Sequence, residues 1–284
     1  MPNAEERTGA PRVIFTDLDG TLIDHHTYAA GPALAALDAC RAAGVAIVPC
    51  SSKTLAEMRA LARDLALAPA PLLVENGSMA WFPSTWPVLP TGIETLPDGP
   101  DGCRVVLGTG ADALRAVLPR VARRVGRTLR PLADMSLDEV VARTGLSPGV
   151  ASLAMAREYS QPVLMDQDDV ALATLDGAAR EAGARITRGG RFFHLVGPTD
   201  KGAAVALVRA TCRAGHRALG LGDAPNDLPL LHAVDDAVIV PRPDGSPHPD
   251  VVRALPGARV APHPGPAGWG AMVLDWLART SAWR

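Results

Sequence analysis

Hydrophobic runs and amphipathic segments alternate between Arg12 and Val74. Arg12–Thr16 is a β-branched and aromatic run, and further apolar runs span 45–50 and 72–74. Between these runs, the segments 32–43 and 55–67 carry apolar residues at helical spacing. Short links therefore join strand, helix, strand, helix and strand, and this order predicts a parallel sheet covered by helices.

The pattern breaks between Phe82 and Gly102, a stretch that contains five prolines and is typical of a crossing between domains. A new unit is expected to begin near Cys103. Its helices and its antiparallel strands predict an α+β domain. The expected elements are a strand at 104–107, helices at 111–125, 137–144 and 148–156, a strand at 162–165, a helix at 170–182 and a hairpin at 185–196.

The alternating pattern resumes after Gly197 and returns the chain to the first domain. The expected elements are a helix at 201–214, a strand at 218–221, a helix at 226–233, a strand at 237–240, an irregular wrap with eight prolines at 241–268 and a closing helix at 270–279. We therefore predict a Rossmann-like, doubly wound α/β core from residues 1–85 and 197–284. An α+β domain is inserted at 86–196.

Composition narrows the class of protein. The 284 residues are 48% hydrophobic and 20% charged with a net charge of −2, which is typical of a globular protein and excludes a disordered one. The weak net charge does not favour a nucleic-acid partner. The polar N-terminus, the lack of a long apolar run and four scattered cysteines predict a cytoplasmic protein with reduced thiols and no contact with membranes. The sequence predicts nothing about the oligomeric state.

The first chemical motif is Asp17-Leu-Asp19-Gly20-Thr21, directly after the first strand. A carboxylate at Asp17 can attack a phosphoryl group, and a second one at Asp19 can protonate the leaving oxygen and later deprotonate water. Gly20 permits the tight turn that follows. The same residues are also typical of a turn that caps the next helix, so this motif alone leaves both interpretations open.

A second acidic loop, Gly222-Asp223-Ala-Pro-Asn226-Asp227, follows the strand at 218–221. Taken alone, it too is compatible with a turn that begins a helix. If both strands belong to one parallel sheet, four carboxylates meet at the same edge, where their repulsion needs a cation. We therefore predict a Mg²⁺ site formed by Asp17, Asp223 and Asp227, with the backbone carbonyl of Asp19 as a further ligand.

Phosphate-binding groups are expected at two further loops. Ser51 follows the second strand, and its hydroxyl and backbone N–H are candidates to donate to a phosphate oxygen. Lys201 begins a helix and supplies a fixed positive charge where negative charge accumulates, so we assign it a catalytic role. A single Ser or Lys is usually solvated surface, and only their positions at these loops favour a functional role. The predicted phosphate-binding set is Ser51, Ser52, Lys53 and Asn226.

These four motifs, in this order, resemble those of the phosphatases of the haloacid dehalogenase superfamily. In that family, the short stretch between Asp19 and Ser51 leaves no room for an inserted cap domain, whereas the much longer stretch from Ser51 to Lys201 does. The resemblance therefore implies the late-cap, Cof-like branch (type IIB). It also implies catalysis with Mg²⁺ through an aspartyl-phosphate on Asp17.

Further strings, at 51–54, 75–77, 157–159, 189–194 and 220–229, are similar to the mannosyl-3-phosphoglycerate phosphatase family within that branch. Ala224 departs from the family, which often has Ser there, and the segment before Arg12 has no counterpart. The resemblance implies a glycosyl phosphoglycerate as substrate. It implies substrate contacts from Glu75, Asn76, Arg157, Glu158, Arg191 and His194.

We therefore predict hydrolysis of mannosyl-3-phosphoglycerate to mannosylglycerate and phosphate. Two alternatives stay open. The first is a phosphatase of another sugar phosphate or of another glycosyl-3-phosphoglycerate, such as the glucosyl compound, because cap residues select the substrate. The second is a sensor that binds a sugar phosphate without catalysis, although such a protein needs neither Asp17 nor Asp19.

Overall fold

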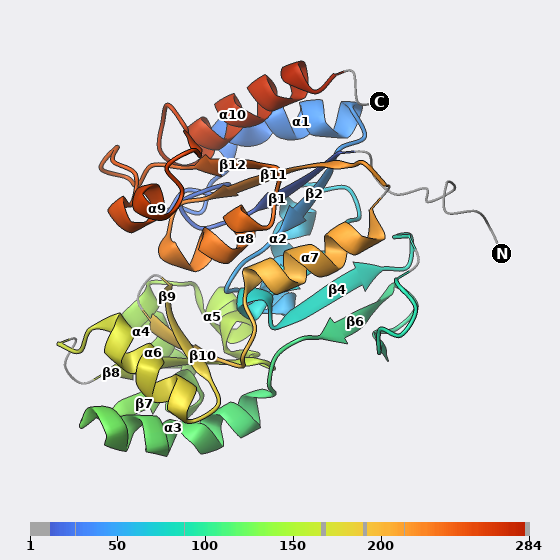
Figure 1. Ribbon diagram of the computed structural model, residues 1–284. Coiled ribbons are helices and arrows are strands. Elements are labelled where there is room, and N and C mark those ends of the chain that lie inside the picture. The colour runs from blue at the N-terminus through green and yellow to red at the C-terminus, as the bar shows by residue number, and fades with distance from the viewer. Residues whose placement is uncertain are drawn as a thin grey trace.

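The structure is a computed structural model (Figure 1), and it describes residues 12–281 apart from 26, 88, 166–168, 190–191 and 213. The chain forms an α/β core and a smaller second lobe that lies beside the carboxyl ends of the core strands. In the described part of the chain, no helix combines the length and the apolar character that crossing a membrane requires.

The core is built on a parallel sheet of five strands in the order β13-β12-β11-β1-β2. In that order, the strands are Arg259–Val260, Asp236–Ile239, Arg217–Gly222, Arg12–Thr16 and Ala46–Pro49. β3 (Leu72–Val74) continues the sheet beside β2 through a parallel bridge between Cys50 and Leu73. The predicted parallel sheet is confirmed.

Helices cover both faces of the core sheet, and β1 is therefore buried at every position. Ile14 packs with α1 (Leu34–Ala42), α2 (Leu55–Asp64) and α10 (Gly265–Arg279), which supplies the buried Trp269 and Trp276. Val13 and Phe15 point to the other face, toward α7 (Lys201–Thr211) and α8 (Leu228–His232). This alternation with period two places helices on both sides and leaves the strand ends free for polar loops.

A second sheet extends the core in a way that the sequence pattern does not predict. It has the order β3-β4-β6-β5, with β4 at Met79–Pro83, β5 at Leu96–Pro97 and β6 at Gly102–Val106. The strand expected to open the second domain is β6, and in the structure it pairs antiparallel with β4. An apolar run identifies a strand but not its partner. The domain limits at 85/86 and 196/197 stay a prediction.

The tail at 241–268, expected to be irregular, contains a helix, α9 (Pro249–Ala254), and the short strand β13. Pro249 stands in the first turn of α9, where a helix needs no N–H from it. The side chain of His248 accepts the N–H of Asp250 at 3.3 Å and so caps the helix. Proline therefore begins a helix here rather than preventing one.

The second lobe is an antiparallel sheet of four strands in the order β7-β8-β10-β9. Helices α3 and α6 pack on one face, and α4 and α5 pack on the other. The hairpin of β9 and β10 is confirmed, with Phe193 opposite Arg188. In chain order, the elements are α3 (Ala111–Val125), β7 (Leu129–Pro131), α4 (Leu137–Thr144), α5 (Pro148–Met155), β8 (Ser160–Met165), α6 (Leu172–Glu181), β9 (Arg185–Gly189) and β10 (Phe192–Val196).

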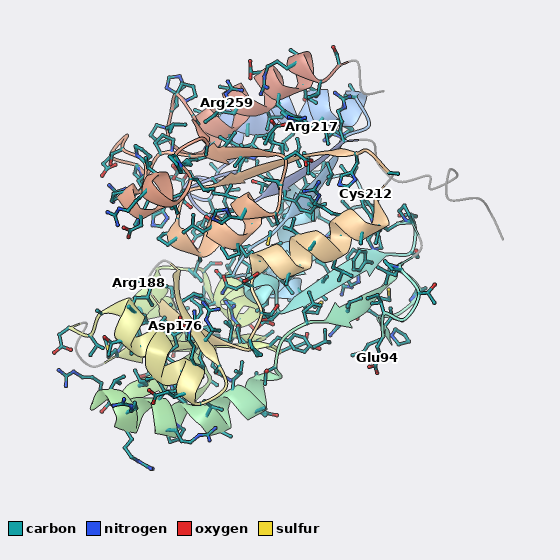
Figure 2. The ribbon with its side chains drawn as sticks, in the orientation of Figure 1. Glu94, Asp176, Arg188, Cys212, Arg217 and Arg259 are labelled. Carbon is teal, nitrogen blue, oxygen red and sulfur yellow. The ribbon has the colours of Figure 1, made fainter. Side chains whose placement is uncertain are left out.

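Charges are balanced at the amino end of the core sheet. Arg217, the first residue of β11 (Figure 2), forms a two-pronged ion pair with Asp236, the first residue of β12, with both contacts at 2.9 Å. The Asp236 carboxylate also accepts the indole N–H of Trp276 at 2.8 Å. The Arg217 guanidinium holds the pKa of Asp236 below its usual value, despite burial. The pair of Arg217 and Asp236 therefore has the features of a structural ion pair.

Candidate active site

Asp17 is held in place by its backbone at the carboxyl end of β1. Its N–H donates to the carbonyl of Leu221 at 2.9 Å, which joins the loop to the neighbouring strand β11. The Thr16 hydroxyl donates to the carbonyl of Asp17 at 2.6 Å and accepts the indole N–H of Trp269 at 3.0 Å. The sheet and the C-terminal helix therefore fix the residue predicted to be the nucleophile.

Lys201 bridges two carboxylates at the centre of the site. Its Nζ lies 2.6 Å from Oδ1 of Asp17 and 2.7 Å from Oδ1 of Asp227, and its side chain is almost fully buried. Burial opposes the positive charge, but the two carboxylates outweigh it and raise the pKa of Lys201 well above its usual value. A cation at the first position of a helix also opposes the helix dipole, so these carboxylates are what stabilise it.

The second acidic loop folds around the Asp227 carboxylate. Oδ2 of Asp227 accepts the backbone N–H groups of Asp223 at 3.0 Å and of Ala224 at 3.1 Å. Gly222 is required for this arrangement, because a Cβ there would lie 2.5 Å from the Cβ of Asp227. Gly20, at a φ of +80°, lies against the Asp223 carboxylate and brings the first acidic loop into contact with the second.

Three of these carboxylates form a group that suits a metal ion. Asp17, Asp223 and Asp227 each offer one oxygen, and these atoms lie within 4.8 Å of one another. Burial, together with the charge of Asp227, raises the pKa of Asp17 to about 7 and that of Asp223 to about 8. Burial and the neighbouring carboxylates both oppose the charged forms, which a divalent cation would stabilise, and hard carboxylate oxygens are the ligands that Mg²⁺ prefers. The residues present therefore fit Mg²⁺.

Asp19, predicted as the general acid and base, is anchored by one oxygen. Its Oδ2 lies 2.9 Å from Nζ of Lys53. Its Oδ1 is buried and has no hydrogen-bond partner among the described residues. Burial opposes the charge of Lys53, but Asp19 and then Glu57 outweigh it and raise the Lys53 pKa. One oxygen is thus held while the other is available to exchange a proton.

The loop after β2 corrects one expectation about phosphate binding. The backbone N–H of Ser51 donates to the carbonyl of Leu73 at 3.0 Å, so the expectation that this N–H binds phosphate was wrong. The sheet uses this donor because the pairing of β2 with β3 continues past the end of β2. The Ser51 hydroxyl remains, and its oxygen accepts the N–H of Lys53 at 3.3 Å. Asn226 lies on the turn Pro225–Asp227, beside β9 of the second lobe.

A turn of three consecutive left-handed residues, Glu75, Asn76 and Gly77, supports this loop from behind. Their φ angles are 49°, 60° and 83°, which is an uncommon conformation for the first two. The N–H of Glu75 donates to the carbonyl of Lys53, and that of Asn76 to the carbonyl of Ser51, both at 2.9 Å. A Cβ at Gly77 would lie 2.3 Å from the carbonyl oxygen of Asp200, so the turn also packs against the start of α7.

The Glu75 carboxylate is fully occupied inside the protein. It accepts the backbone N–H groups of Glu158 at 3.0 Å and of Tyr159 at 3.1 Å, together with the hydroxyl of Ser160. Glu75, predicted to contact substrate, thus anchors the chain that enters β8. In contrast, the Asn76 side-chain amide is 4% exposed and has no partner within the described ranges, so it is available to a ligand.

Among the other predicted substrate residues, those that the structure describes contact different parts of the protein. Arg157 donates to the carbonyls of Ala154, at 2.8 Å, and of Ser52. The Glu158 carboxylate is 46% exposed and pairs with Arg104 at 2.7 Å. His194 is buried on β10, opposite Thr187 of β9. Arg191 lies outside the described residues.

A capping box at the start of α2, which follows the loop after β2, was not identified from the sequence. Thr54 and Glu57 cap each other, with side chain to backbone distances of 3.2 and 2.8 Å. The Thr54 hydroxyl also donates to the carbonyl of Leu153 at the end of α5, at 2.9 Å. The pattern of a threonine followed three residues later by a glutamate was the available signal.

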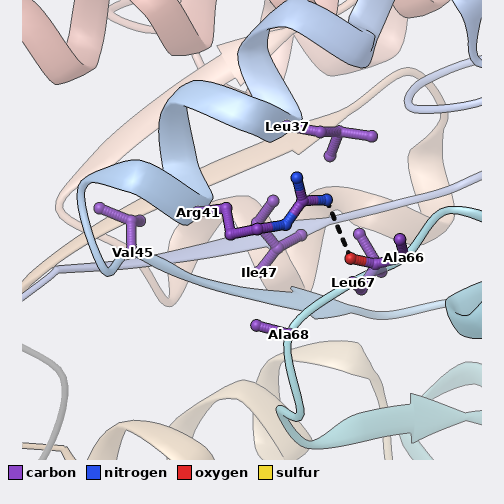
Figure 3. A pocket seen from close by; sticks show the side chains of 7 residues that line it. All are labelled: Leu37, Arg41, Val45, Ile47, Ala66, Leu67 and Ala68. Carbon is purple, nitrogen blue, oxygen red and sulfur yellow. Dashed lines mark hydrogen bonds between the residues drawn. The ribbon is translucent and has the colours of Figure 1, made fainter.

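A small cavity elsewhere on the core has no features of a ligand site. It lies between α1, β2 and the chain after α2, and its lining is mostly apolar (Figure 3). Its charged residue, Arg41, donates to the carbonyl of Ala66 at 3.0 Å, so no polar group is aimed into it. The lining residues are Leu37, Arg41, Val45, Ile47, Ala66, Leu67 and Ala68.

Comparisons with known proteins agree with this geometry. The family model of the haloacid dehalogenase-like hydrolases matches residues 14–93. The glucosyl-3-phosphoglycerate/mannosyl-3-phosphoglycerate phosphatase of Methanococcoides burtonii is 32% identical over 272 residues, which are 95% of this chain and 98% of that protein. The phosphatase of the same description from Persephonella marina is 32% identical over 267 residues, 92% and 95% of the two chains.

Among solved structures, a sugar phosphatase described as belonging to subclass IIB of the same superfamily shares the fold. Its TM-score is 0.62 at 14% sequence identity, and the match covers 95% of this chain and 99% of that chain.

Proposed function

We propose, from the premise that the chain belongs to the haloacid dehalogenase-like hydrolases and is a phosphatase, that it hydrolyses mannosyl-3-phosphoglycerate with Mg²⁺ as cofactor. The observation that carries the chemistry is the buried group of Asp17, Asp223 and Asp227, with Lys201 bridging two of them. A protein that only bound a sugar phosphate would not need a nucleophile and a proton donor placed this way, which disfavours the sensor.

The reaction proceeds by double displacement on the residues of this chain. A carboxylate oxygen of Asp17 attacks phosphorus, and Asp19 gives a proton to the leaving oxygen of the glycerate. Asp19 then takes a proton from the water that attacks the aspartyl-phosphate, which releases phosphate and restores Asp17. The Ser51 hydroxyl and Lys201 hold phosphoryl oxygens, with Ser52, Lys53 and Asn226 as the further predicted contacts.

Mg²⁺ would be held by Asp17, Asp223, Asp227 and the carbonyl of Asp19. When bound, it neutralises charge on the carboxylates and on the phosphoryl group. The four carboxylates of the site face two ammonium groups, Lys53 and Lys201, so two negative charges remain to be balanced. A divalent cation supplies that balance.

The substrate is proposed from the relatives, whose names include both the glucosyl and the mannosyl compound. A phosphate-release assay with Mg²⁺ over mannosyl-3-phosphoglycerate, glucosyl-3-phosphoglycerate, simple sugar phosphates and an aryl phosphate tests it. We expect the highest kcat/KM on the mannosyl compound. A higher value on the glucosyl compound or on a simple sugar phosphate would replace this substrate. No release from any of them would favour the sensor.

Selection by the second lobe can be tested separately. We expect His194→Ala and Arg191→Ala to lower kcat/KM on the glycosyl phosphoglycerate, with a loss of roughly 2–4 kcal/mol of transition-state stabilisation. On an aryl phosphate, kcat/KM should change by less than about threefold. Equal losses on both substrates would remove these residues from the substrate site. We also propose that the enzyme acts in the cytoplasm.

A further inference from the structure

Arg157 joins the second lobe to the loop predicted to bind phosphate. Its Nε donates to the carbonyl of Ala154, at the end of α5, at 2.8 Å, while its Nη1 donates to the carbonyl of Ser52. Its Nη2 also lies 3.6 Å from the Glu57 carboxylate, and its side chain is 11% exposed. The guanidinium is therefore committed to backbone carbonyls and to Glu57.

The contact with Ser52 fixes the direction of one peptide unit. In a trans peptide the carbonyl and the following N–H point in opposite directions. Because the Ser52 carbonyl faces Arg157, the N–H of Lys53 points the other way, where it donates to the Ser51 hydroxyl oxygen at 3.3 Å. A hydroxyl has a single proton to donate. With its oxygen already accepting from Lys53, Ser51 can direct that proton to a phosphoryl oxygen.

We propose that Arg157 is a positioning residue for Ser51. It orients the Ser52–Lys53 peptide when the second lobe lies against the core, and it does not contact the sugar or the glycerate. This inference rests on the proposed function, in which Ser51 holds the phosphoryl group. It differs from the role that the family resemblance implies for Arg157.

The two roles make different predictions for kinetics. A substrate contact would be lost only on a substrate that has a sugar and a carboxylate. A positioning residue acts on the phosphoryl group that all substrates share, so its loss lowers kcat on all of them and leaves KM nearly unchanged. We expect Arg157→Met to lower kcat by about tenfold on both mannosyl-3-phosphoglycerate and p-nitrophenyl phosphate, as for one displaced hydrogen-bond donor.

A double-mutant cycle with Ser51→Ala tests the route through which Arg157 acts. If Arg157 works through the Ser51 hydroxyl, Arg157→Met should lower kcat by less than about twofold once Ser51 is alanine. Arg157→Lys, which keeps a donor, should recover part of the rate. Arg120→Met is the matched control, because Arg120 also donates to a carbonyl, that of Ala182 at 3.3 Å, but within the second lobe. It should leave kcat unchanged.

Three results would overturn the proposal. These are a loss confined to the glycosyl phosphoglycerate, full multiplication of the two single losses in the double variant, or no loss in Arg157→Met. Unfolding midpoints identify a variant that fails to fold, in which case Arg157→Lys and its cycle with Ser51→Ala decide. If the wild-type enzyme releases phosphate from none of the substrates, the proposed function fails first, and this inference fails with it.

Discussion

On the core side of the site, Lys201 and Lys53 hold three carboxylates at 2.6 to 2.9 Å. On the side of the second lobe, in contrast, Arg157 binds backbone carbonyls, and Glu158 pairs with Arg104 at the surface. The core side places like charges together in a buried space, at a cost in stability, whereas on the lobe side Glu158 is paired with Arg104 and Arg157 lies 3.6 Å from Glu57.

This difference separates the residues proposed to carry out the chemistry from those that join the second lobe to the core. Buried like charges lie together where the proposed cation would bind, because a cation relieves their repulsion. Arg157 and Glu158, in contrast, join the second lobe to the core. The following predictions begin with the variant expected to have the largest effect.

Loss of the nucleophile should have the largest effect. Asp17→Asn removes the attacking charge and one metal ligand, so phosphate release should fall by roughly 1,000-fold or more on every phosphomonoester. The exposed Asp244→Asn is the control and should be fully active. Circular dichroism would verify that the variant is folded. Turnover above a few per cent of wild type would contradict the assignment of Asp17.

Removal of divalent ions tests the carboxylates of the core side. It should abolish phosphate release without unfolding the protein. Excess chelator should stop phosphate release, and Mg²⁺ should restore it. Mg²⁺ at about 100 times its Kd should also raise the free energy of unfolding by about 2.7 kcal/mol. The matched variant Asp223→Asn should show a smaller thermal shift. Full activity in chelator, with no metal found by elemental analysis, would rule out the metal site.

Glu75→Gln tests the anchor between the two sides. The amide keeps the shape but presents an NH₂ group to a backbone donor, so at least one of the three hydrogen bonds to the carboxylate is lost and those that remain are weakened. We expect the free energy of unfolding to fall by about 2 kcal/mol in urea titrations, with similar fractional losses of activity on large and small substrates. A loss of activity on the glycosyl phosphoglycerate alone, without a loss of stability, would instead support a substrate contact at Glu75.

Glu158→Gln should have the smallest effect. Its carboxylate is 46% exposed and its ion pair with Arg104 is screened by solvent, so stability should change by less than about 1 kcal/mol. If activity on mannosyl-3-phosphoglycerate falls more than tenfold while activity on an aryl phosphate does not, Glu158 reaches the substrate after all. The comparison between the two sides would then need revision.

The meeting of Asp17, Asp223 and Asp227 could be predicted from the sequence because both acidic loops follow buried strands. Asp17 and Asp223 come directly after β1 and β11, which are neighbours in the sheet, so locating the strands also located the carboxylates. The prediction that these acids meet was therefore a consequence of topology.

The contacts of Glu75, Arg157 and β6 could not be predicted in the same way. Glu75 and Arg157 each have partners far away in the sequence, on the opposite side of the boundary between the core and the second lobe. Hydrophobic periodicity carries no information about such pairs. The use of the Ser51 N–H by Leu73 depended on pairing past the end of a strand, which a local pattern does not show.

The position of β1 between β2 and β11 has a consequence for synthesis on the ribosome. The strand that precedes Asp17 is made before its neighbour β11, which begins only at Arg217, after the whole of the second lobe. The second lobe, whose sheet pairs only residues 129–196, can fold in the meantime. During that interval the edge of β1 that later pairs with β11 is unpaired, so this apolar strand is open to pairing with other chains until β11 is made.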